Sequence, residues 1–231
     1  MVLCDGWQGS PPASRGASAM RRLREWTRDE DGRMSSDVLV PEAGQLGRAA
    51  RLKAATQATH ERLDRAIMAR RPFADRGSYG RFLELQLRFH RELDPFYRHE
   101  PVRSLIPDLQ GRQRLELIHR DFFDLGMAVP GAAFRAERPV DVAIALGWLY
   151  VAEGSNLGAA FLLKEAARLG LSEQFGARHL AAAPDGRGRH WKTFIAALDA
   201  AELAADEDDR VVEGARAAFR SVHRHVVDLF G

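Results

Sequence analysis

The chain has 231 residues, 45% of them hydrophobic, so it can bury the core of one large domain or of two small ones. Its 34 Lys and Arg residues nearly balance 32 Asp and Glu residues, and this formal net charge of +2 gives no reason to expect a nucleic-acid-binding protein. The single cysteine, Cys4, excludes an intramolecular disulfide and a cysteine-based zinc site. Because no apolar signal segment follows the start, we expect a cytoplasmic protein.

The first 44 residues differ in composition from the rest. Residues 8–18 are rich in Gly, Ser and Pro, and residues 28–34 are mostly charged. We expect residues 1–44 to form a disordered extension, in which residues 20–26 are a candidate for a short helix. The folded domain is expected over residues 45–231.

Apolar side chains then recur with the period of a helix. The first predicted helix begins at Gly47 and ends before Pro72, because proline disfavours helical geometry in the residue before it. A second helix, capped by Asp75 or Ser78, extends to about Tyr97. Its apolar stripe consists of Phe82, Leu85, Phe89 and Leu93.

The remainder of the chain is also predicted to be helical. A connection over residues 101–107 leads to a third helix over residues 112–125, and Pro139 opens a long fourth helix that ends near Leu169, before Gly170. The other predicted elements are a loop over residues 126–131, a short segment over residues 173–178, and helices over residues 188–203 and 206–230. No segment shows the alternation of a strand, so we expect an all-α, single-domain helical bundle.

The most apolar stretch covers residues 142–163 and is long enough to cross a membrane. Glu153, Ser155 and Asn156 lie at its middle, where lipid would strongly disfavour them. We therefore expect a buried helix with a polar face, and no membrane association.

His60 is a candidate metal ligand. Asp64 lies one helical turn later, where its carboxylate can accept the Nδ1 proton and leave Nε2 to bind a metal. The alternative is an ordinary exposed His–Asp pair that contributes about 0.3 kcal/mol. These two residues alone do not decide between the two interpretations.

Three glycines interrupt the long apolar helix. Gly147, Gly154 and Gly158 each cost about 1 kcal/mol relative to alanine in a helix interior. Either another helix packs closely against them, or they expose bare backbone to a ligand. Glu153 and Ser155 favour the second reason because they can hold ordered waters beside a ligand. If His60 faces these glycines, the two helices form a slot for a planar iron cofactor.

Several segments of the chain resemble bacterial, biliverdin-producing haem oxygenases, and the resemblance covers residues 51–230. The similar segments are His60-Glu-Arg-Leu-Asp64, Arg71-Pro-Phe-Ala74, Tyr79-Gly-Arg-Phe82, Asp94-Pro-Phe-Tyr-Arg98, Leu146-Gly-Trp-Leu-Tyr-Val-Ala-Glu-Gly-Ser-Asn-Leu-Gly-Ala-Ala-Phe-Leu-Leu-Lys164, Phe175-Gly-Ala-Arg-His-Leu180 and Trp191-Lys-Thr-Phe194. The resemblance implies an all-helical fold that holds haem b between the first helix and a glycine-kinked distal helix. His60 then corresponds to the axial iron ligand, and Asp64 to the residue that holds its Nδ1.

The resemblance also assigns the distal helix. Gly154 and Gly158 correspond to the glycines whose backbone faces haem, and Ser155 or Glu153 is expected to order the waters that deliver protons.

Three further residues are assigned to the haem propionates. Lys164 corresponds to a basic residue that pairs with a propionate, and Lys53 and Tyr150 correspond to positions near the propionate edge. This combination is similar to that of members that open haem at the α-meso carbon, which implies biliverdin IXα.

The implied reaction is cleavage of haem by O2 and reducing equivalents to biliverdin, CO and Fe2+. An external donor, such as a ferredoxin or a flavin reductase, is expected because the chain has no flavin or nicotinamide fingerprint. The reaction would serve either iron acquisition or bilin supply to a bacteriophytochrome. Two alternatives remain open at this point: a non-catalytic haem carrier, and a thiaminase-like or quinone-cofactor-synthesis protein on the same scaffold.

Overall fold

The computed structural model describes residues 47–106, 108–131 and 139–231, and in these ranges every regular element is a helix. Besides the helices, only isolated bridges join Ser172 to Phe175 and Gly176 within the described ranges. The all-α prediction is confirmed. The predicted N-terminal extension, with its candidate helix over residues 20–26, lies outside the described residues.

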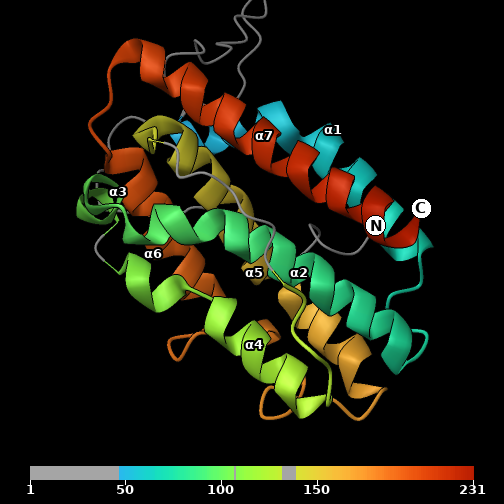
Figure 1. Ribbon diagram of the computed structural model, residues 1–231. Helices are drawn as coiled ribbons and strands as arrows, with labels where there is room; N and C mark the ends of the chain where they lie inside the picture. The colour runs from blue at the N-terminus through green and yellow to red at the C-terminus, as the bar shows by residue number, and fades with distance from the viewer. Residues whose placement is uncertain (1–46, 107, 132–138) are drawn as a thin grey trace, which may run out of the picture. The chain divides into compact units, whose positions relative to one another are not determined.

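Seven α-helices and two short 3-10 helices (η) make up the described part (Figure 1). They are α1 (Arg48–Ala69), α2 (Arg76–Arg98), α3 (Glu100–Leu105), η2 (Leu109–Arg112), α4 (Leu115–Asp124), α5 (Val142–Ala167), η3 (Arg178–Leu180), α6 (Arg187–Ala200) and α7 (Ala205–Phe230). The apolar helix α5 is the central element, and α7 packs along it and along α1. Helices α2, α6 and η3 cover other parts of α5.

Local signals explain where the helices begin and end. Asp75 caps α2, and its side chain accepts a hydrogen bond of 2.7 Å from the backbone N–H of Ser78. This hydrogen bond lowers the pKa of the Asp75 carboxyl. The cap of α5 is Asp141, which accepts from the N–H of Ile144, so the helix begins at Val142 rather than at Pro139 as predicted.

The predicted connection over residues 101–107 is wrong for most of its length, because α3 covers Glu100–Leu105. Pro101 lies in the first turn of this helix, where its missing N–H is no disadvantage. Val102 is fully buried and anchors the short helix to the core. The third predicted helix begins later than expected, since residues 109–112 form the 3-10 turn η2.

Helices α5 and α7 cross with their backbones in contact. A Cβ atom at Gly147 would lie 2.1 Å from the carbonyl oxygen of Val211 on α7. A Cβ atom at Gly214 would lie 2.2 Å from the carbonyl oxygen of Ile144 on α5. Only glycine fits at either position, so close helix packing is the reason for Gly147.

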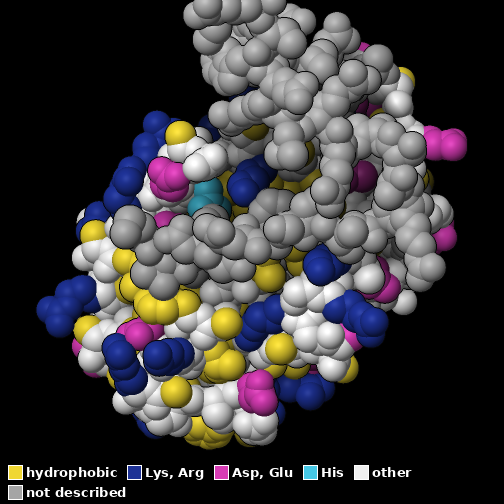
Figure 2. All heavy atoms as spheres, turned by 180° about the vertical axis from the view of Figure 1, so that it is seen from behind, with side chains coloured by type: hydrophobic (Ala, Val, Ile, Leu, Met, Phe, Trp, Pro, Cys, Tyr) yellow, Lys and Arg dark blue, Asp and Glu magenta, His cyan; other side chains and the backbone are white. Residues whose placement is uncertain are grey.

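The surface carries mixed charge. Figure 2 shows Lys and Arg side chains interspersed with Asp and Glu on the face drawn there, rather than gathered in a single basic band. No helix among the described residues is both long enough and apolar enough to cross a membrane.

Candidate functional site

A cleft lined mainly by apolar side chains lies between α1, α2, α5 and α7. It contains about 780 Å³ of space free of protein atoms, part of it open to solvent. Its apolar walls include Leu63, Ile67, Phe89, Val151, Leu162, Phe219 and Val222. Polar groups reach it only at a few points, which is typical of a site for a largely apolar ligand.

His60 and Asp64 lie together on the α1 wall of this cleft. His60 Nδ1 is 3.3 Å from Asp64 Oδ2, at the long end of the hydrogen-bonding range, and both side chains are about three-quarters buried. Burial raises the pKa of the Asp64 carboxyl, and the His60 ring opposes this shift. On its other side, the imidazole meets the Phe219 ring edge-on, with 5.8 Å between ring centroids. The imidazole is thus oriented by one polar and one aromatic neighbour.

The opposite wall is one face of α5. Val151, Gly154, Ser155, Gly158 and Leu162 line the cleft, and their spacing puts them on one side of a helix that is unbroken through its glycines. A Cβ atom at Gly154 would meet nothing nearer than the Trp191 ring at 3.9 Å. Protein packing therefore leaves room for a side chain at Gly154, in contrast to Gly147.

Glu153 does not line the cleft. It is 1% exposed, and its Oε2 accepts a hydrogen bond of 2.7 Å from Arg112 Nη1. Adjacent residues of a helix point about 100° apart, so the neighbour of Gly154 faces η2 and α6 instead. Burial raises the pKa of the Glu153 carboxyl, and Arg112 opposes this shift.

The three residues assigned to the haem propionates lie apart from the cleft walls. Lys53 on α1 and Lys164 in the last turn of α5 are exposed. Tyr150 is half-buried, and its ring packs on Trp191 with 5.6 Å between centroids. None of the three is among the residues that line the cleft.

The contribution of α7 to the cleft, and part of that of α2, was not predicted from the sequence. Phe219 and Val222 of α7 and Gln86 of α2 line the cleft, and Phe89 was interpreted only as part of an apolar stripe. The apolar face of α7 was a usable signal, but periodicity does not tell which cavity a face borders. Arg112, fully buried and hydrogen-bonded to two carboxylates, was also missed.

The residues of the cleft fit a haem. An imidazole oriented by a carboxylate supplies a nitrogen ligand for iron, and the apolar walls suit a porphyrin. At Gly154, α5 offers space in which a bare backbone can approach a flat ligand.

A histidine that faces a glycine-bearing helix across an apolar cleft is the arrangement that the resemblance to haem oxygenases predicts. Residues 47–228 match the family described as "Heme oxygenase", and the chain belongs to this family of haem-cleaving oxidoreductases. It is 44% identical over 185 residues to the "Heme oxygenase PigA" of Pseudomonas aeruginosa, covering 79% of this chain and 93% of that protein. It also superimposes with a TM-score of 0.75 on the haem oxygenase of Neisseria meningitidis, whose NO- and CO-bound forms have been crystallised. That match has 41% identity and covers 80% of this chain and 93% of the other.

Proposed function

We propose that this haem oxygenase binds haem b in the cleft between α1 and α5, with His60 as the axial ligand, and converts it to biliverdin, CO and Fe2+. One observation carries the proposal: His60, Asp64 and the glycine face of α5 border the same apolar cleft. Haem, when bound, supplies the oxygen-activating redox chemistry, and the protein supplies ligation, orientation and a controlled distal side.

Each residue of the cleft has a distinct task in this proposal. The Asp64 carboxylate holds His60 Nδ1, which fixes the ring orientation and directs the other nitrogen to iron. Phe219 restricts rotation of the imidazole and keeps water away from it. On the distal side, Gly154 and Gly158 expose backbone, and the Ser155 hydroxyl holds the waters that deliver protons. Glu153 is fixed behind this face by Arg112 and does not deliver protons from the cleft itself.

The finer assignments are part of the same proposal. Lys164 and Lys53 bind the haem propionates with exposed ammonium groups, and Tyr150 lies near the same edge, so that opening at the α-meso carbon gives biliverdin IXα. Electrons come from an external ferredoxin or flavin reductase in the cytoplasm. The product would supply a bacteriophytochrome where the cell has one.

Addition of hemin to the purified chain, followed by a reductant under air with catalase present, tests the reaction. We expect the Soret band to disappear while a broad far-red band of biliverdin grows, and chromatography of the pigment to show the IXα isomer. His60→Ala should abolish turnover, whereas the exposed His223→Ala on α7 should leave it unchanged.

Each other outcome has a clear meaning. A Soret band that persists in protein that has bound haem would contradict catalysis and favour a haem carrier. A different isomer would leave the reaction intact and contradict the roles of Lys53 and Tyr150. Turnover in His60→Ala at the unsubstituted rate would contradict the axial ligand.

A further inference from the structure

A second pocket lies away from the haem cleft and shares no lining residue with it. It opens between α4, η2 and the segment over residues 181–185, and contains about 750 Å³ of space free of protein atoms, part of it open to solvent. Its walls include Arg114, Arg120, Arg178 and His190. It plays no part in the proposed haem chemistry.

Arg114 is the unusual member of this pocket. The residue is only 7% exposed, yet its Nε has no hydrogen-bond partner and its guanidinium has no ion pair among the residues that the structure describes. Burial lowers the pKa of the Arg114 guanidinium. Arg112, two residues earlier, is fully buried but binds both Asp108 and Glu153. Burial of the Nε–H without an acceptor carries a desolvation cost, and an anion on the guanidinium would supply an opposite charge at short range.

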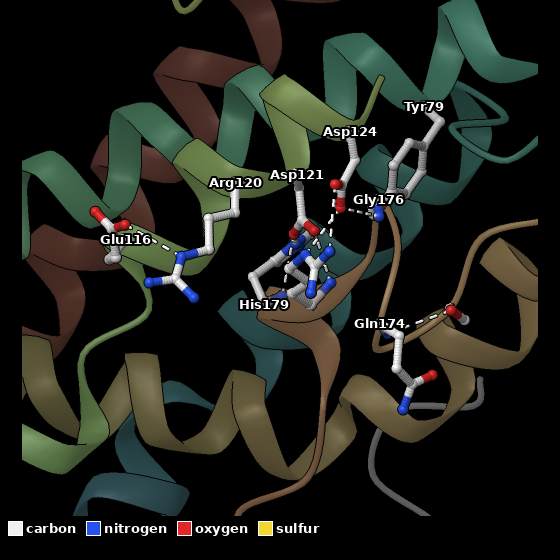
Figure 3. Close-up of polar contacts among 10 residues, drawn as sticks. Tyr79, Glu116, Arg120, Asp121, Asp124, Gln174, Gly176 and His179 are labelled. Atoms are coloured by element: carbon white, nitrogen blue, oxygen red, sulfur yellow. Dashed lines mark hydrogen bonds and ion pairs between the residues drawn. The ribbon is translucent and has the colours of Figure 1, made fainter. Parts of the chain in front are cut away.

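Two aspartates of α4 hold the segment around Arg178, which borders the pocket (Figure 3). Asp121 accepts hydrogen bonds from the backbone N–H groups of Arg178 at 2.8 Å and His179 at 3.0 Å, and its Oδ2 is 2.7 Å from His179 Nδ1. Asp124 accepts from the N–H of Gly176 and from Arg178 Nε, both at 2.8 Å. These bonds fix the backbone of residues 176–179, so a ligand would not have to order this part of the wall.

The two other guanidiniums of the lining already have ion-pair partners. Arg178 is paired with Asp124, and Arg120 with Glu116. His190 is 3.8 Å from Asp185 through Nδ1 and 3.5 Å from Glu153 through Nε2. The acidic groups of the lining are Asp185 and Glu173, and Glu173 is exposed. Arg114 is thus the one guanidinium of the lining without an ion-pair partner among the described residues. The rest of the lining is apolar, from Leu117 and Ala181 to Pro184.

We propose that this pocket binds a small monocarboxylate with a short apolar tail, its carboxylate on the Arg114 guanidinium and its tail against the alanine-rich segment. A guanidinium pairs with a carboxylate through two parallel N–H···O bonds, and the carboxylates of Glu173 and Asp185 in the lining favour a ligand with one negative charge over a dianion. The site does not depend on haem.

Titration of the full-length chain with sodium butyrate at fixed ionic strength tests this site. Calorimetry and the ¹H–¹⁵N signals of arginine side chains measure the binding. Butyramide has the same shape without the charge and serves as the matched ligand. We expect saturable binding of butyrate, about tenfold or more tighter than that of butyramide, because a charge-assisted hydrogen bond is lost in the amide. Arg114→Leu should lose this preference, and Arg103→Leu, at an exposed residue of α3 paired with Glu100, should keep it.

Two results would overturn the proposal. If butyrate shows no saturable binding, or binds no better than butyramide, the pocket holds ordered water only. If Arg114→Leu binds butyrate as the unsubstituted chain does, another group holds the anion. Arg114→Lys retains the charge and should keep part of the preference for butyrate over butyramide. It provides a test of the site if the Arg114→Leu protein does not fold. A Soret titration with hemin reports the haem cleft separately.

Discussion

Alanine substitution should affect two glycines of α5 in opposite directions. At Gly154 an added Cβ meets nothing nearer than 3.9 Å, so Gly154→Ala should gain the helix propensity of alanine, about 1 kcal/mol. For a domain of this size that gain raises Tm by about 2–4 °C. At Gly147 the added Cβ would lie 2.1 Å from the Val211 carbonyl oxygen, so α5 and α7 must separate. Gly147→Ala should lose about 3 kcal/mol, at the upper end of overpacking costs, and about 6–12 °C in Tm.

The same pair separates stability from turnover. Gly154→Ala places a methyl group on the cleft wall that is proposed to face haem, so hemin turnover should slow although the fold becomes more stable. Thermal melts by circular dichroism and Soret-decay rates measure the two effects. A Gly154→Ala protein as unstable as Gly147→Ala would show that Gly154 serves packing. A stabilised Gly154→Ala protein with unchanged turnover would show that the bare backbone has no role in the reaction.

Three further substitutions test the buried polar groups. Arg112→Leu leaves the Glu153 carboxyl buried without its partner and should lower the free energy of unfolding, measured in urea, by about 3–5 kcal/mol. A second substitution, Glu153→Leu, should restore much of this loss. If the losses of the two substitutions simply add, the pairing is contradicted. Burial lowers the pKa of His90 to about 3 from 6.5, so the unfolded chain binds one more proton between these pH values and stability falls as pH drops from 6.5 to 3. His90→Leu should flatten this slope in pH-dependent urea unfolding, unlike the exposed His223→Leu. Tyr79→Phe removes a hydrogen bond of 2.8 Å to the Gly176 carbonyl and should cost about 1–2 kcal/mol in thermal melts without changing hemin affinity; a changed affinity would place this loop in the haem site.

Local rules predicted the end of a helix well where a single capping residue decides it. Asp75 was predicted as one of two caps of the second helix, and the structure selects it over Ser78. The start of α5 was misplaced by three residues because proline and Asp141 both signal a helix start, and the aspartate side chain supplies the hydrogen bond. At α3, burial of Val102 stabilises a helix too short to be predicted from its periodicity.

The candidate site was also predicted only in part. The spacing of His60 and Asp64, and that of Gly154 and Gly158, indicated which residues share a helical face, and the structure brings both faces to one cleft. Spacing could not tell that Gly147 contacts α7, because its local sequence resembles that of the other glycines. Those contacts form between segments some 65 residues apart in the sequence. Rules that consider one helix at a time cannot predict them.

The backbone contact of α5 with α7 also sets how the cleft can change its width. Gly147 and Gly214 let the two helices touch without intervening side chains, so this crossing can neither compress nor slide easily. Gly154 lies seven residues further along α5, about 10 Å away at the rise of an α-helix. The contact at Gly147 is therefore the fixed point about which α5 can tilt. A tilt by about 6° would move the cleft wall at Gly154 by about 1 Å. A tilt of this size would widen or narrow the cleft at Gly154 while the contact at Gly147 stays in place.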